Sequence, residues 1–151
     1  MLAFKRILVP VDFSSCSGEA IRVGAELSTR FAAELCIVHV YEPAHYALPQ
    51  GFPLYTPGQL ENLLGVYARQ LEAAKQDAEA AGALRVQTQQ LQGVVATEIV
   101  GYAKEHGFDL IVMGTHGRTG LQHALVGSVA EKVVRRAPCS VLTVRTRDHK
   151  G

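Results

Sequence analysis

The sequence predicts an α/β fold: a single doubly wound domain with a five-stranded parallel sheet and helices on both faces. Short apolar segments rich in branched residues alternate along the chain with longer amphipathic segments. The apolar segments show little alternation with polar residues, which is typical of strands buried on both faces. Strands that alternate with helices pair in parallel through right-handed crossovers, and we expect the strand order 3-2-1-4-5.

The N-terminal part is predicted to contain two strands and a helix. Arg6 to Val11 (RILVPV) is the first strand, and Asp12 closes it. Ser14 or Ser15 can cap the helix that follows. The second strand is Leu35 to Val40 (LCIVHV). The apolar face of the helix is formed, at helical spacing, by Ala20, Ile21, Gly24, Leu27 and Phe31.

Residues 42–58 are predicted to form a loop or lid, because their four prolines are incompatible with a helix or a central strand. A long helix follows, and we expect it to end near Gly82. Its apolar stripe comprises Leu60, Leu63, Leu64, Tyr67, Leu71, Ala74, Ala78 and Ala81.

The C-terminal part is predicted to contain three strands and two helices. The strands are Leu84 to Leu91, Asp109 to Gly114 (DLIVMG) and Ser140 to Val144 (SVLTV). The first of the two helices should end near Gly107, and Pro138 should stop the second. Their inward residues are predicted to be Ala96, Ile99, Val100 and Ala103 in the former, and Val129, Ala130, Val133 and Val134 in the latter.

Composition places the chain among ordinary globular proteins. With 151 residues, of which 48% are hydrophobic, we expect one domain at 1–145 and a polar tail at 146–151. Fifteen basic and fourteen acidic side chains leave no strong field, so we expect no nucleic-acid partner. No apolar run reaches the roughly 18 residues of a membrane span, and no signal peptide is recognisable. We therefore expect no membrane partner and a cytoplasmic location.

Cysteines and histidines offer little chemistry in this sequence. Cys16, Cys36 and Cys139 lack a paired spacing, so we expect reduced thiols, with Cys16 a small residue in a turn. His116 and His123 lie in the loop after the fourth predicted strand, but no nucleophile with a fixed acid partner can be assigned around them. We expect no catalytic residue.

The same loop is rich in glycine and precedes a helix. It reads GTHGRTGLQHALVGSVAEK, with Gly114, Gly117 and Gly120 in the loop and Gly127 with Ser128 at the start of the helix. Glycines bring main-chain N–H groups close to an anion, and the N-terminus of a helix favours negative charge. The order of strand, glycine-rich loop and helix therefore favours phosphate as the ligand. The pattern is neither a Walker loop nor the dinucleotide fingerprint.

Purely structural explanations remain open at these positions. Ser128 and Glu131 have the spacing of a helix capping box, which explains the serine without a ligand. Asp12 can start a turn or cap a helix instead of contacting a metal. Arg118 can be an exposed loop cation. In any fold of this type, core positions would be occupied by Val40 and Met113.

Three segments resemble the universal stress protein family: ILVPVD, DLIVMGTHGRTGL and GSVAEKVVRRAPCSVLTVR. The resemblance covers nearly the whole chain, although residues 42–92 contribute little to it. The spacing of Gly114, Gly117 and Gly127, followed by Ser128, is similar to that family's ATP-binding signature.

The resemblance implies a site for ATP, or for ADP or AMP. Adenine would lie between the ends of the first two strands, largely against main-chain groups, and the glycine loop would surround the phosphates. Asp12 would also help to hold Mg²⁺, which favours carboxylate and phosphate oxygens. The implied binding residues are Pro10, Val11, Asp12, Val40, Met113, Gly114, Gly117, Arg118, Gly127, Ser128 and Val129.

We expect a stress-response protein in which ATP occupancy switches the shape or partner choice of a homodimer. One alternative is a slow magnesium-dependent ATP hydrolase that uses Asp12 and Arg118. Another is an interaction protein with no bound nucleotide. The dimer is expected to form through Val141 to Val144, an apolar strand at a sheet edge, and the resemblance implies the same strand.

Overall fold

The structure is a computed structural model that describes residues 2–43, 55–116 and 126–146. Within these ranges, five strands form one parallel sheet in the order β3-β2-β1-β4-β5, as predicted. The strands are β1 (Arg6–Pro10), β2 (Glu34–Tyr41), β3 (Val86–Gln92), β4 (Leu110–Gly114) and β5 (Ser140–Val144).

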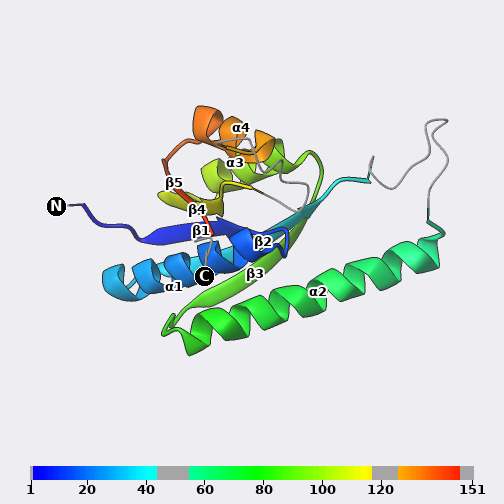
Figure 1. The fold of residues 1–151 in the computed structure, drawn as a ribbon, viewed down its shortest axis with the longest axis horizontal. Helices are drawn as coiled ribbons and strands as arrows, with labels where there is room; N and C mark the ends of the chain where they lie inside the picture. The colour runs from blue at the N-terminus through cyan, green and yellow to red at the C-terminus, as the bar shows by residue number, and fades with distance from the viewer. Residues whose placement is uncertain (1, 44–54, 117–125, 147–151) are drawn as a thin grey trace, which may run out of the picture.

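Helices cover both faces of the sheet. Figure 1 shows α1 and α2 on one face and α3 and α4 on the other. This arrangement confirms the predicted doubly wound fold. The helices are α1 (Ser15–Phe31), α2 (Pro57–Ala80), α3 (Val95–Glu105) and α4 (Ser128–Arg136).

Two apolar cores lie on opposite faces of the central strands. Ile7 and Val9 of β1 pack in the core with α1 and α2, whereas Leu8 between them packs in the core with α3 and α4. All three side chains are fully buried. Because successive side chains of a strand point to opposite faces, a continuous apolar run is the pattern that such a strand requires.

Local sequence signals set the helix ends. Ser14 caps α1, accepting a hydrogen bond from the N–H of Ser17. Thr56 and Gln59 form a capping box at the start of α2. That helix therefore begins at Pro57, inside the stretch that we expected to be a loop, because proline is well tolerated at the first helical position.

Several predicted core positions are exposed. Val134 is 53% exposed, because α4 is short and turns only Ala130 and Val133 fully inward. Leu84, which we expected to begin the third strand, is 90% exposed and precedes β3, which begins at Val86. In α2 the buried residues are Leu71, Ala74 and Ala78, because the N-terminal turns of this helix extend past the sheet (Figure 1).

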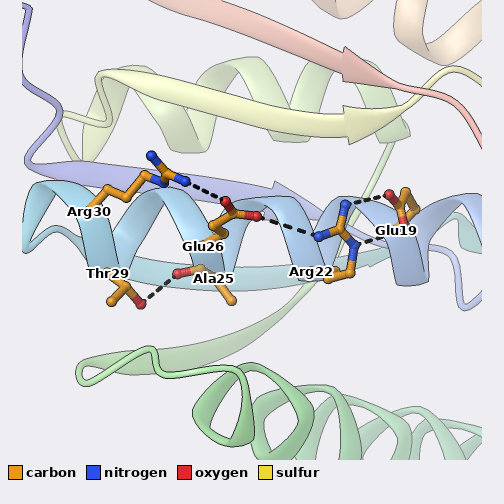
Figure 2. A network of polar contacts seen from close by, with 6 residues as sticks. All are labelled: Glu19, Arg22, Ala25, Glu26, Thr29 and Arg30. Atoms are coloured by element: carbon orange, nitrogen blue, oxygen red, sulfur yellow. Dashed lines mark hydrogen bonds and ion pairs between the residues drawn. The ribbon is translucent and has the colours of Figure 1, made fainter.

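The solvent face of α1 carries a ladder of ion pairs. Figure 2 shows Arg22 between Glu19 and Glu26, with N–O distances of 2.7 and 3.5 Å, and Arg30 on the other oxygen of Glu26 at 2.9 Å. Exposed pairs of this kind contribute little to stability. The apolar face that α1 packs on the sheet therefore holds it in place. In the ranges that the structure describes, no helix is long and apolar enough to cross a membrane.

We predict that Gly24→Ala destabilises the protein. A β-carbon at Gly24 would lie 2.7 Å from Cγ2 of Val9. Overpacking costs roughly 1–3 kcal/mol, and the better helix propensity of alanine offsets up to about 1 kcal/mol. We expect urea denaturation to show a net loss of about 1–2 kcal/mol in the free energy of unfolding.

Gly18→Ala is the matched control in the same helix. A β-carbon at Gly18 would meet nothing within 4 Å. This variant should be as stable as the parent or more stable, by up to about 1 kcal/mol. Equal effects of the two substitutions would contradict the close packing of α1 on β1.

Candidate functional site

The candidate site lies at the carboxyl edge of the sheet, where the strand order reverses. β1 pairs with β2 on one side and with β4 on the other. The chain continues from β1 into Asp12 and from β4 into Thr115. In open parallel sheets, a crevice for ligands forms where neighbouring strands connect to opposite faces.

A compact turn holds Asp12 after β1. Its Oδ1 accepts hydrogen bonds from the N–H of Ser14 at 3.0 Å and from the hydroxyl of Ser17 at 2.7 Å. The N–H of Asp12 in turn donates to Oγ of Ser17 at 2.9 Å. The carboxylate therefore starts an Asx turn, one of the alternatives left open by the sequence, and leads the chain into α1.

The end of β4 packs tightly against the start of α1. A β-carbon on Gly114 would lie 2.7 Å from Sγ of Cys16. Cys16 lies in the first turn of α1 and is buried, and its Sγ is 3.3 Å from the carbonyl oxygen of Val144. Cys16 is thus a packing residue in a helix, not the turn residue that we expected. Glycine is required at position 114, because Cys16 leaves no room for a side chain there.

Gly127 fixes the start of α4 against the residue that follows β4. Its N–H donates to the carbonyl oxygen of Thr115, and a β-carbon at Gly127 would lie 2.7 Å from that same oxygen. Thr115 is itself buried and donates its N–H to Val144 in β5. Only a residue without a side chain allows this approach.

The predicted capping box at α4 is wrong. Gly127 is the N-cap and Ser128 is the first residue of the helix, so the Ser128 side chain does not cap this end. In an α-helix the first N–H groups have no acceptor within the helix. The N–H groups of Ser128, Val129 and Ala130 therefore stand at a helix terminus that favours negative charge.

The other expected residues fall into two groups. Pro10, Val11, Val40 and Met113 are buried at the ends of β1, β2 and β4. Val11 packs in the core with α1 and α2, and the side chains of Val40 and Met113 pack in the core with α3 and α4, so all three are core residues. Outside the described residues lie Gly117, Gly120, Arg118 and His123.

Main-chain groups of Val40 extend beyond the end of β1. At the end of this ladder, the N–H of Val11 donates to the carbonyl oxygen of Val38 at 2.8 Å. Main-chain groups alternate in direction along a strand, so those of Val40 point to the same side as those of Val38. The N–H and carbonyl of Val40 therefore point into the space above β1.

Titratable side chains near the site show no catalytic arrangement in the described part of the chain. Nδ1 of His116 lies 3.0 Å from Oγ1 of Thr115. Groups of three or more His, Cys, Asp and Glu side chains that could hold a metal do not occur within residues 2–43, 55–116 and 126–146. A candidate metal would therefore depend on Asp12 and on oxygens from a ligand.

The cysteines are free thiols. Burial raises the pKa of Cys36, and a hydrogen bond from Tyr102 and the charge of Arg6 act in the opposite direction. Burial and Asp109 raise the pKa of Cys139. Both groups are therefore protonated and unreactive near neutral pH.

A separate hollow lies at the opposite, amino edge of the sheet. It is lined in part by Arg6, Glu34, Arg85 and Phe108. Arg6 pairs with Glu34 at 3.1 Å and lies over the ring of Phe108. Because Arg6 and Glu34 satisfy one another, the hollow has the features of a surface between strand ends and not of a ligand site.

Comparison with known proteins decides the family. The family model described as Universal stress protein family matches residues 3–145. The chain belongs to the universal stress protein family. A universal stress protein of Methanocaldococcus jannaschii is 38% identical over 144 residues, covering 94% of this chain and 82% of the relative.

Solved universal stress proteins share the fold. UspA of Lactobacillus plantarum is 29% identical, with a TM-score of 0.81, over 96% of this chain and 100% of that one. A universal stress protein in complex with cAMP is 27% identical, with a TM-score of 0.73, over 97% and 100% of the two chains. The likeness therefore extends over the described sheet and its helices.

The sequence alone did not identify three residues that shape the carboxyl edge of the sheet in this universal stress protein. The hydroxyl of Ser17 hydrogen-bonds to Asp12, and the carbonyl oxygen of Thr115 accepts from the N–H of Gly127. The side chain of Cys16 fills the space beside Gly114. The helical pattern of SSCSGEA places Cys16 and Ser17 in the first turn, but the partners of Cys16, Gly114 and Val144, are distant in sequence, and the bond from Ser17 to Asp12 crosses the turn at Phe13. Only the fold brings them together.

We predict that Ser17→Ala destabilises the turn at Asp12. The substitution removes the hydroxyl that accepts from the Asp12 N–H and donates to its carboxylate. Loss of such buried hydrogen bonds costs about 1–3 kcal/mol, measurable as a lower midpoint in urea.

Ser15→Ala is the control, since Ser15 is exposed in the same turn. It should change the free energy of unfolding by less than about 0.5 kcal/mol. A Ser17→Ala protein as stable as the Ser15→Ala protein would show that the turn does not depend on this hydroxyl.

Proposed function

We propose that this universal stress protein binds an adenine nucleotide, ATP or a related form, at the carboxyl edge of its sheet. The observation that carries the proposal is the N-terminus of α4, which has a glycine as its N-cap and is held beside the end of β4 by Gly127. Its first N–H groups point out of the helix at the position where a phosphate would be favoured. The relative in complex with cAMP supports an adenine nucleotide as the ligand class.

Adenine recognition is proposed to use main-chain groups. Val40 directs its N–H and carbonyl past the last bond between β1 and β2, and the turn at Asp12 lies next to this space. Val11 and Met113, each buried in the core on its own face of the sheet, would hold the ends of β1 and β4 in place beside the base. A planar ring with donor and acceptor atoms on its edge suits such a pair of strand ends.

The phosphates are proposed to lie against the glycine segment. Gly127, Ser128 and Val129 present main-chain N–H groups, and Gly114 keeps the end of β4 free of a side chain. Gly117 and Arg118 are proposed to complete the contacts. Such a cradle binds charge without a fixed lysine, because the helix terminus itself carries partial positive charge.

Magnesium is the metal that this donor set fits. Mg²⁺ is commonly bound by one or two carboxylates together with phosphate oxygens. Asp12 supplies one carboxylate, of which Oδ1 is engaged by Ser14 and Ser17. Mg²⁺ would neutralise phosphate charge at this edge, while the chain's own residues orient the nucleotide.

Regulation through a homodimer completes the proposal. β5 forms one edge of the described sheet, pairing with β4 on one side. Leu142 in this strand is 40% exposed, and strand edges with apolar side chains favour pairing with a second copy. The N–H of Thr115 bonds to Val144, so the dimer strand and the start of α4 share a contact through which occupancy can affect assembly.

We predict that Gly127→Ala weakens nucleotide binding by on the order of tenfold or more, because the β-carbon pushes the start of α4 away from Thr115. Isothermal titration with Mg-ATP and with cAMP measures the loss. Gly101→Ala is the control, since its β-carbon meets nothing within 4 Å in α3. Equal affinities of the two variants would contradict the proposed phosphate site.

The hydrolase alternative is tested on the same proteins. Phosphate release from Mg-ATP should be negligible in the parent if the protein acts by binding alone. Robust turnover that is lost in Gly127→Ala and kept in Gly101→Ala would favour an enzyme. If the parent protein gives no heat and no shift in melting temperature with millimolar nucleotide, the proposed binding function is wrong.

We predict that Leu142→Asp yields a monomer, because it places a charge in the proposed apolar edge contact. Sedimentation at micromolar protein should show a dimer for the parent and a monomer for the variant. Val66→Asp is the control, since Val66 is similarly exposed but lies on α2, beside the other edge of the sheet (Figure 1). A parent protein that sediments as a monomer would exclude this assembly.

A further inference from the structure

Phe13 has a backbone conformation that bulky side chains rarely adopt. Its φ is 65°, in the left-handed region, between the end of β1 and the start of α1. Phenylalanine is strained there, because its β-carbon crowds the neighbouring carbonyl oxygen. Such a conformation persists only where surrounding contacts over-determine it.

Those contacts come from two other elements. The ring of Phe13 lies 4.8 Å from the ring of His39 in β2 and 6.0 Å from that of Tyr67 in α2, measured between centroids. The planes of Phe13 and Tyr67 differ by only 16°, and the centroids of His39 and Tyr67 are 4.3 Å apart. Three elements thus meet in one ring cluster, at distances typical of attractive aromatic pairs.

The turn around Phe13 is the turn that positions Asp12. The hydrogen bond from the Ser14 N–H to Oδ1 of Asp12 spans Phe13. If Phe13 returned to a common backbone conformation, Ser14 and Ser17 would rotate away from the carboxylate. The direction of Asp12 and the start of α1 therefore depend on the backbone of Phe13.

We propose that Tyr67 is a positioning residue for the nucleotide edge. By packing its ring against those of Phe13 and His39, it holds Phe13 in the left-handed conformation and so fixes the turn at Asp12. The functional meaning of this inference rests on the proposed nucleotide site. It makes α2, an element outside the proposed contact set, a determinant of nucleotide affinity.

The test compares substitutions at Tyr67 in the full chain. Tyr67→Leu removes the ring and keeps an apolar side chain, whereas Tyr67→Phe keeps the ring. Amide hydrogen exchange at Ser14 and Ser17 reports the turn without any ligand, and titration with Mg-ATP reports the site. Tyr67→Leu should speed exchange and weaken binding, each by on the order of tenfold. Tyr67→Phe should stay within about twofold of the parent in both.

Controls separate positioning from general packing. Val66→Ala, at an exposed neighbour on α2, should leave both readouts unchanged. Glycine adopts positive φ without strain, so the support of Tyr67 is dispensable in a Phe13→Gly background. There, Tyr67→Leu should have little further effect on exchange or affinity. An equal effect of Tyr67→Leu in both backgrounds would mean that it acts only through packing of α2, and would overturn the proposal.

The two readouts also separate this inference from the proposed function. A parent protein that binds neither Mg-ATP nor cAMP refutes the function, and the exchange comparison still decides the role of Tyr67. Unchanged exchange at Ser14 and Ser17 in Tyr67→Leu overturns the inference whatever the affinity. Should Tyr67→Leu fail to fold, Tyr67→Met, which fills irregular space more readily, takes its place in every comparison.

Discussion

Burial of the central strands on both faces is the constraint on which this structure depends. Leu8 of β1 and Ile111 of β4 must be covered on one face, and Ile7 and Val112 on the other. Helices are therefore required on both sides, and the chain must cross from one face to the other between β1 and β4. In open parallel sheets, such a reversal is the place where a crevice for ligands forms at the carboxyl edge. The location of the candidate site therefore follows from the need to cover both faces of the sheet with helices.

The sequence predicted the elements whose signals are local and periodic. Unbroken apolar runs marked β1, β2 and β4, and glycine and proline marked the ends of α2, α3 and α4. The predictions were wrong where contacts with other parts of the fold override the local sequence pattern. Val134 matches a helical stripe but is exposed, and Ser128 has a capping spacing but lies inside the helix because Gly127 is anchored by Thr115. No short-range pattern encodes a contact between residues so far apart.

The candidate site likewise contains residues that the sequence identifies and residues around them that only the structure reveals. Gly114 and Gly127 could be recognised in sequence, and the structure leaves no room for a β-carbon at either position. The partners of Asp12, in contrast, became evident only from geometry, and so did the positive φ of Phe13. Since the proposed recognition uses main-chain atoms of Val40 and α4, the side chains that matter most are those that place the backbone.

The contact between Gly127 and Thr115 also has a consequence for chain length. The connection between β4 and α4 leaves the sheet at Thr115 and is tied back to the same residue at Gly127. The start of α4 is therefore fixed to the sheet by a contact that does not itself involve the residues between them. Because the entropy of closing a loop grows only slowly with its length, insertions there should cost the fold little. This connection offers evolution, or an engineer, a place to add a new peptide while the scaffold stays intact.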